Sequence, residues 1–153
     1  MQSLSRLIKG IGILLCTLAA MVSPVVAGET RYFKDRDKNG DRIVLRATPD
    51  RILSGTFLAT KPHTLKCDDD VVLVGGFSIK STKITNGRFR TVSNGYMGEG
   101  GSWNLTVRGV LRGDAIRGAI TFHFINRAAE GSFECWSGKG KKDPVVSYVA
   151  RTG

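Results

Sequence analysis

The sequence has few of the residues that most often do chemistry in proteins. Only two histidines and three cysteines occur among 153 residues. His63, His123, Cys67 and Cys135 lack the close paired spacing of zinc ligands, so no zinc site is predicted. Neither histidine has a nucleophile and a carboxylate at positions that would place all three together. The sequence therefore predicts no catalytic residues, no cofactor and no enzyme.

Helical periodicity is also missing after residue 28. No segment there keeps apolar residues at helical spacing for three turns, whereas period-two alternation bounded by Gly, Asn, Asp and Pro recurs. This pattern excludes a helical domain and predicts an all-β one. We expect a single antiparallel β-sandwich, or a closed barrel, of seven or eight strands. The strands are expected near residues 42–48, 51–59, 71–79, 88–92, 103–112, 115–125, 132–137 and 145–151.

The only long apolar run lies at the start of the chain. Arg6 and Lys9 precede apolar residues 11–21, and small residues follow, as in a cleaved secretion signal. An uncleaved anchor is disfavoured because polar and proline residues interrupt the run before it reaches the roughly 20 residues that span a bilayer. We therefore expect a signal peptide over 1–27 and an exported β domain over 28–153. That domain would be secreted or periplasmic, with no transmembrane segment.

Cysteine is scarce enough to predict one pairing. Cys16 would leave with the signal peptide, so the exported domain keeps Cys67 and Cys135. Thiols oxidise outside the cytoplasm, and a single Cys67–Cys135 disulfide is the expected result. In the chain-entropy model such a bond stabilises the fold by roughly 4 kcal/mol.

Acidic residues are few relative to basic ones. Lys and Arg number 23 against 13 Asp and Glu, and the first 27 residues hold two of the basic residues and none of the acidic. The exported domain thus carries a net charge of +8. Such a charge favours anionic polymers or an anionic envelope surface as partners, or serves solubility alone.

The best-determined element is a hairpin over residues 103–125. Gly113-Asp114 supplies a two-residue turn whose first position tolerates positive φ, and this turn sets the register. One face then becomes apolar or glycine throughout and should be core. The predicted pairs are Leu111 with Ile116, Gly109 with Gly118, Val107 with Ile120, Leu105 with Phe122 and Trp103 with Phe124. The facing glycines leave a gap that we expect Trp136 to fill.

The opposite face of this hairpin is polar and basic. It contains His123 and Asn104 beside its arginines, and Arg88 and Arg90 flank Phe89 on a neighbouring strand. Aromatic residues are not clearly interleaved there, so no specific nucleic-acid recognition is predicted. The predicted anion-binding residues are Arg108, Arg112, Arg117, Lys139, Lys141 and Lys142.

Two glycine-containing segments are open to different interpretations. The stretch 94–101 holds four glycines and is predicted to be a mobile loop. Residues 35–41 match the first half of a calcium loop, but Arg46 stands where the closing carboxylate is expected. We favour a hairpin turn at Asn39-Gly40 and keep calcium as the alternative. The calcium ligands would be Asp35, Asp37, Asn39 and Asp41.

Several landmarks in the chain fall in a recognisable order. They are Ser54-Gly55-Thr56-Phe57, Cys67, Ile84-Thr85-Asn86-Gly87-Arg88-Phe89, Cys135-Trp136-Ser137-Gly138 and Tyr148-Val149-Ala150. With them the chain resembles a loose group of small exported bacterial β-domain proteins that have a central and a late cysteine. The resemblance extends from about residue 42 onward. It implies the β fold and the disulfide, and it implies no activity.

We expect the domain to be a non-enzymatic binding module for anionic envelope or extracellular components. Two alternatives stay open. A secreted protein-binding inhibitor would expose an anchor such as Tyr96 or Met97. A small extracellular hydrolase would need a pocket that joins His123 or His63 to a carboxylate and a hydroxyl.

Overall fold

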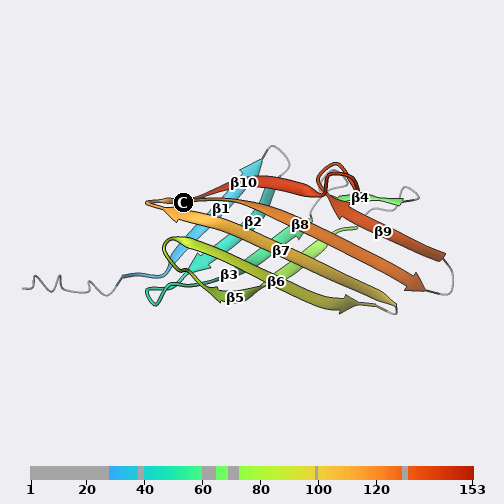
Figure 1. Ribbon diagram of the computed structural model, residues 1–153, viewed down its shortest axis with the longest axis horizontal. Helices are drawn as coiled ribbons and strands as arrows, with labels where there is room; N and C mark the ends of the chain where they lie inside the picture. The colour runs from blue at the N-terminus through green and yellow to red at the C-terminus, as the bar shows by residue number, and fades with distance from the viewer. Residues whose placement is uncertain (1–27, 38–39, 60–64, 69–72, 99, 129–130) are drawn as a thin grey trace, which may run out of the picture.

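A computed structural model describes residues 28–37, 40–59, 65–68, 73–98, 100–128 and 131–153, apart from the side chains of 36, 37, 40, 41 and 128. These residues form strands joined by turns, and an antiparallel all-β fold is confirmed (Figure 1). The strands are β1 (Arg31–Asp37), β2 (Gly40–Ala47), β3 (Ile52–Ala59), β4 (Leu65–Cys67), β5 (Gly75–Lys83), β6 (Arg88–Met97), β7 (Gly101–Arg112), β8 (Ala115–Ala128), β9 (Gly131–Ser137) and β10 (Val145–Thr152).

All ten strands belong to one sheet. Its order is β4-β9-β8-β10-β1-β2-β3-β5. On the other edge of β8, β7 pairs with β8, and β6 pairs with the far edge of β7. β8 is the organising strand, because β9 pairs with residues 123–128 and β10 with residues 115–121 along the same edge. β9 and β10 thus run one after the other beside β8. β4 and β9 extend the sheet at one end (Figure 1).

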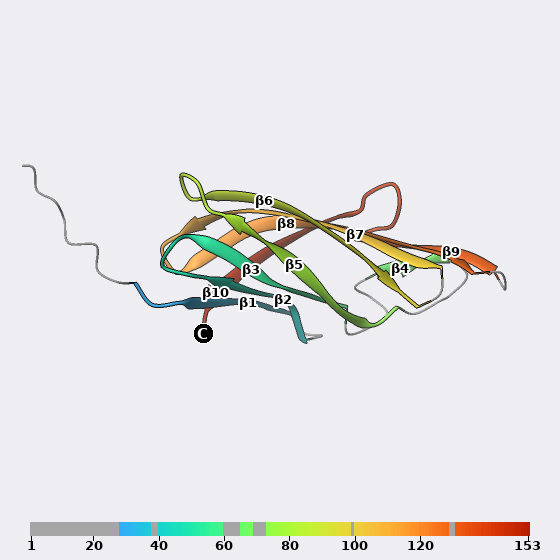
Figure 2. The ribbon, with the colours of Figure 1, turned by 90° about the horizontal axis from the view of Figure 1, so that it is seen from below.

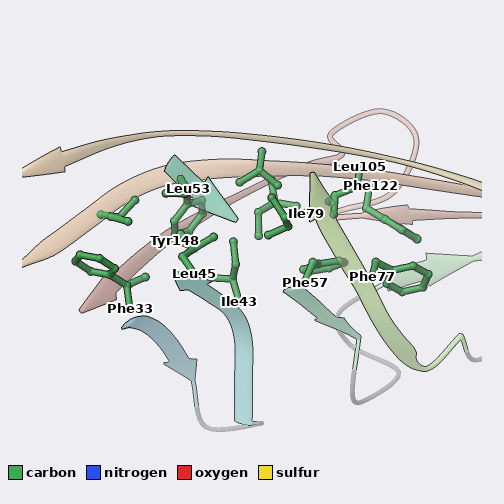
Figure 3. Packing of buried hydrophobic residues seen from close by; sticks show 14 of the residues in the cluster. Phe33, Ile43, Leu45, Leu53, Phe57, Phe77, Ile79, Leu105, Phe122 and Tyr148 are labelled. Atoms are coloured by element: carbon green, nitrogen blue, oxygen red, sulfur yellow. The ribbon is translucent and has the colours of Figure 1, made fainter. Parts of the chain in front are cut away.

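The sheet curls so that its two halves face one another. In Figure 2, β6, β7 and β8 lie along one side and β1, β2 and β3 along the other, with the core between them. Figure 3 shows buried side chains from both halves meeting there. The rings of Phe77 and Phe122 lie 4.4 Å apart between centroids, and Phe57 packs against both. Burial of each such ring stabilises the fold by about 1.5–3 kcal/mol.

The β7–β8 hairpin has the predicted register. Gly113 has a φ of 56°, as the turn requires, and all five predicted pairs occur. Leu105, Val107, Ile120 and Phe122 are fully buried. The turn chemistry and the apolar alternation therefore pointed to the same register, and both were correct.

The gap at the facing glycines is present, but the prediction that Trp136 fills it is wrong. Tyr148 of β10 occupies it: a Cβ on Gly118 would stand 2.6 Å from the Tyr148 ring, and one on Gly109 would stand 2.8 Å from Phe89. Trp136 points to the opposite side of the sheet, since it pairs directly with the outward-facing His123.

β5 and β6 meet through side chains. The Ser93 hydroxyl accepts a hydrogen bond from the Lys80 N–H at 2.6 Å, and the Thr91 hydroxyl donates to the Lys80 carbonyl at 3.0 Å. Thr82 likewise donates to the Arg90 carbonyl at 3.3 Å. Ser93 and Thr91 are buried polar residues, and these bonds satisfy them.

Several expectations about elements need correction. The segment 94–101 is not a loop as a whole, because residues 94–97 complete β6 and Met97 pairs with Gly101. β4 was not predicted. β5 begins four residues later than the strand expected at 71–79 and runs on to Lys83. The predicted hairpin between β1 and β2 is present, but Gly40 pairs with Asp37 and belongs to β2, so it is not a turn residue as expected.

The disulfide is confirmed. Cys67 and Cys135 face each other on β4 and β9, with their Cα atoms 3.9 Å apart. The bond ties the short β4 to the sheet across a sequence separation of 68 residues. It stands at the end of the molecule farthest along β8 from the Gly113 turn.

Candidate functional site

Arginines gather on the outward side of the sheet near the Gly113 turn. The predicted Arg108, Arg112 and Arg117 are exposed on the same side of β7 and β8. Arg88 and Arg90 join them from β6, since they lie opposite Val110 and Arg108, and Arg151 joins from β10 opposite Ala115. We call this set the arginine face: Arg88, Arg90, Arg108, Arg112, Arg117 and Arg151.

One pair within the arginine face is electrostatically unfavourable. Arg90 and Arg108 lie directly opposite each other on neighbouring strands. Like charges in this position destabilise a sheet. Over the part of the chain that the structure describes, no carboxylate forms an ion pair with either of them.

Two shallow depressions lie between the arginines. One, of about 600 Å³, is lined by Val110, Arg112, Asp114, Ala115, Arg117 and Arg151. The other, of about 320 Å³, has Arg88, Arg108 and Arg117 among its lining residues. Arg117 belongs to both depressions and links them. Asp114 is the single acidic residue lining either one, so both are strongly cationic.

The three predicted lysines are not part of the arginine face. They lie in the loop between β9 and β10, which stands out from the outward side of the sheet (Figure 2). Lys139 lies 3.8 Å from Asp143, and Lys141 lies 3.8 Å from Glu134. The charges of Lys139 and Lys141 are thus partly balanced by carboxylates of their own neighbourhood. The predicted anion-binding set divides into two groups, and only the arginines stand together.

A different group of side chains occupies the other end of the same outward side. Cross-strand pairing places Asn94, Asn104, His123 and Trp136 in one row over β6, β7, β8 and β9. The imidazole of His123 stacks on the Trp136 indole, with centroids 3.5 Å apart and planes at 11°. Its Nε2 lies 3.2 Å from Glu134 Oε2. This row joins polar groups that the sequence separates by more than forty residues.

The groups around Glu134 change the pKa of its carboxyl. The hydrogen bond with His123 lowers the pKa of the Glu134 carboxyl, partial burial opposes this, and the charge of Lys141 adds to the lowering. The contact of His123 with Glu134 was not predicted. The sequence feature that could have predicted this contact is the position of residues 123 and 134 on two expected strands joined by a short turn. Strand alternation then places both side chains on the outward side.

Next to this row lies a depression of about 300 Å³. Its lining includes Asn94, Tyr96, Ser102, Trp103, Asn104 and His123. Tyr96, one of the two predicted inhibitor anchors, is 90% exposed, whereas Met97 packs against the core. His63, the other histidine considered for a hydrolase, lies outside the described residues. For His123, no hydroxyl nucleophile bonds to it within the described ranges.

The calcium alternative gains no support from Asp35. This residue is buried, and its carboxylate pairs with Arg42 at 2.5 Å. Asn39 lies outside the described residues, as do the side chains of Asp37 and Asp41, so calcium binding there stays a prediction. Where side chains are described, no group of three His, Cys, Asp or Glu residues is placed to hold a metal ion.

The described strands and turns include no helix with the length and apolar character needed to cross a membrane. Comparison with protein-family models, with curated proteins and with solved structures finds no match for this chain.

Proposed function

We propose that this protein is an exported, non-enzymatic module that binds an anionic polymer of the envelope or extracellular space on its arginine face. The observation that supports this best is the direct opposition of Arg90 and Arg108 without a carboxylate partner in the described chain. A rule of sheet stability is broken there, and such breaks are characteristic of functional sites. A repeating anion would neutralise several guanidinium groups at once.

The proposed location follows from two features. Residues 1–27 have the pattern of a secretion signal. The disulfide between Cys67 and Cys135 is of a kind that persists in oxidising compartments. Together they support a secreted or periplasmic protein.

We further propose that the curled sheet acts as a closed barrel rather than a sandwich. The side-chain hydrogen bonds of Ser93, Thr91 and Thr82 support this, because they connect β5 to β6 where a backbone ladder would otherwise be needed. Closure would hold the arginine face rigid, so that binding orders few protein groups.

The test replaces three arginines and measures polymer binding. In the variant R90Q/R108Q/R117Q we expect at least a tenfold loss of affinity for alginate and for polyphosphate, measured by titration calorimetry. The wild-type affinity should fall steeply with added salt. The matched control R46Q/K80Q/K83Q removes the same charge from exposed residues of β2 and β5.

The control variant should bind within about twofold of wild type, because net charge alone is not what binds. Equal losses in the two variants would show a nonspecific charge effect and contradict the proposal. Binding that does not change with salt would contradict it as well.

A further inference from the structure

The depression beside His123 differs chemically from the arginine face. Its lining includes the side chains of two asparagines, Ser102, Tyr96, His123 and Ile125, with no arginine or lysine. The indole of Trp103, another lining residue, packs on Phe77 in the core. Amides and hydroxyls both donate and accept hydrogen bonds. Such a set suits a ligand ring rich in hydroxyl groups rather than a bare anion.

The strand register and the contacts of His123 hold part of this depression in place before any ligand arrives. Asn94 and Asn104 stand directly opposite each other on β6 and β7. His123 is fixed on one side by its stack on Trp136 and on another by Glu134. Groups held in this way lose little freedom on binding, which favours recognition.

Tyr96 adds an apolar surface to the polar row. Its ring is 90% exposed at the end of β6, and it lines the depression beside Asn94. A side chain of this size gains nothing for the fold by standing in water. An aromatic ring next to paired amides can accept the apolar face of a sugar while the amides bond to its hydroxyls.

The depression and the arginine face lie on the same outward side. Asn104 precedes Arg108 by four residues on β7, which is a separation of about 14 Å along a strand. The row between them contains Val92, Thr106 and Thr121, with no acidic residue. A single extended polymer can therefore reach both the depression and the arginine face without passing an acidic side chain.

We propose that the bound polymer is an acidic polysaccharide, with a sugar ring in the depression lined by Asn94, Tyr96 and Asn104 and its carboxylates on the arginine face. This inference rests on the proposed function. Polyphosphate would use the arginines alone. Single-stranded nucleic acid would need successive aromatic rings along its path, whereas Val92, Thr106 and Thr121 occupy that path.

The experiment compares three probes on the oxidised domain: an alginate oligomer, polyphosphate of the same charge and an oligothymidylate. The variant N94A/Y96A/N104A should lower the alginate affinity about tenfold and leave the polyphosphate affinity within about twofold. Alginate should also change the fluorescence of Trp136, because this indole stacks on His123, which lines the depression.

A matched control keeps this test specific. The variant Y32A removes an exposed tyrosine of β1, which is 56% exposed and does not line the depression. We expect it to bind alginate like wild type. Thermal unfolding of both variants should match wild type, since all the altered side chains are exposed.

The outcomes separate this inference from the proposed function. If N94A/Y96A/N104A binds alginate as tightly as wild type, or loses polyphosphate and alginate equally, the polysaccharide inference is wrong while an anion-binding function stands. If oligothymidylate binds more tightly than alginate and requires Tyr96, the ligand is a nucleic acid and the inference is wrong. If none of the three probes binds, the proposed function itself fails.

Discussion

The two ends of the β7–β8 hairpin share one backbone ladder but differ in what stands behind their outward side chains. Near the Gly113 turn, the arginines project from strands whose inner side is filled by Tyr148 and Phe89. At the other end, His123 stacks on Trp136, and β9 is tied to β4 by the disulfide. At the turn end the residues proposed to bind and the residues that hold the fold are therefore separate. At the other end, which we call the open end, His123 and Trp136 belong to both groups.

This difference predicts that substitutions at the two ends will affect the stability of the fold differently. Exposed charges without partners contribute little to stability, so evolution can change the arginines with little effect on folding. At the open end His123 contacts Trp136 and Glu134 across strands, so a change to one of these three alters both the site and the sheet edge. Four variants test this contrast, from the largest expected effect on stability to the smallest.

Removing the disulfide should have the largest effect. The variant C67S/C135S should lower the free energy of unfolding by about 4 kcal/mol, because the bond closes a loop across 68 residues. Urea unfolding measures this, and hydrogen exchange should show the greatest loss of protection in β4 and β9. Equal loss of protection near Gly113 would contradict the difference between the two ends.

Filling the gap at the turn end should come next. In G118A the added Cβ would stand 2.6 Å from the Tyr148 ring and 2.1 Å from the Arg108 carbonyl oxygen, so we expect a loss of about 3 kcal/mol. The control G113A meets no atom within 4 Å and should cost about 1 kcal/mol through its positive φ alone. A smaller loss in G118A than in G113A would show that Tyr148 can move aside.

Tyr148 makes the turn end sensitive to alkali. Burial raises the pKa of its hydroxyl above the ordinary value near 10. The unfolded chain therefore ionises first, and stability should fall as the pH rises above about 10. Y148F lacks this group, so it should be about 1 kcal/mol less stable at neutral pH through the lost hydrogen bond to Arg108, and the difference should shrink in alkali. Parallel urea midpoints from about pH 8 to about pH 11 would contradict this.

Glu134 makes the open end sensitive to acid. Because its folded-state pKa is lowered, mainly by the hydrogen bond with His123, its contribution is present above the ordinary value of 4.5 and is lost as the pH falls through the lowered value. E134Q should be slightly less stable than wild type at neutral pH and equal to it in strong acid. Urea midpoints that differ by the same amount throughout would show that the carboxylate plays no part.

The β7–β8 hairpin was predictable from sequence because two independent signals agree there. A Gly-Asp turn sets the register, and alternation over ten residues sets the faces. The orientation of Trp136 was not predictable in the same way. It depends on the register of β9 against β8, and a shift of one residue would have turned the indole into the core.

Other errors have similarly local causes. Gly95 suggested a loop, yet the Trp103 ring packs so closely that a Cβ there would stand 2.7 Å from it, which explains the glycine within a strand. β4 has three residues, too few for any periodicity to show. At the site, strand alternation predicted the outward position of the arginines on β7 and β8. The placement of Arg151 near Arg112 was not predictable, because it depends on the pairing of β10 with β8.

The junction between β9 and β10 has a consequence for engineering. The chain leaves the sheet after Ser137 and returns at Val145 beside the same edge of β8. The Ser137 hydroxyl accepts a hydrogen bond from the Phe122 N–H and donates one to the Pro144 carbonyl. These two bonds fix the start and the end of the loop. Backbone hydrogen bonds join Lys139 to Asp143 and Asp143 to Gly140, whereas Lys141 and Lys142 between them are exposed. A tag or a grafted peptide inserted between Lys141 and Lys142 would therefore be displayed on the outward side without disturbing the strands.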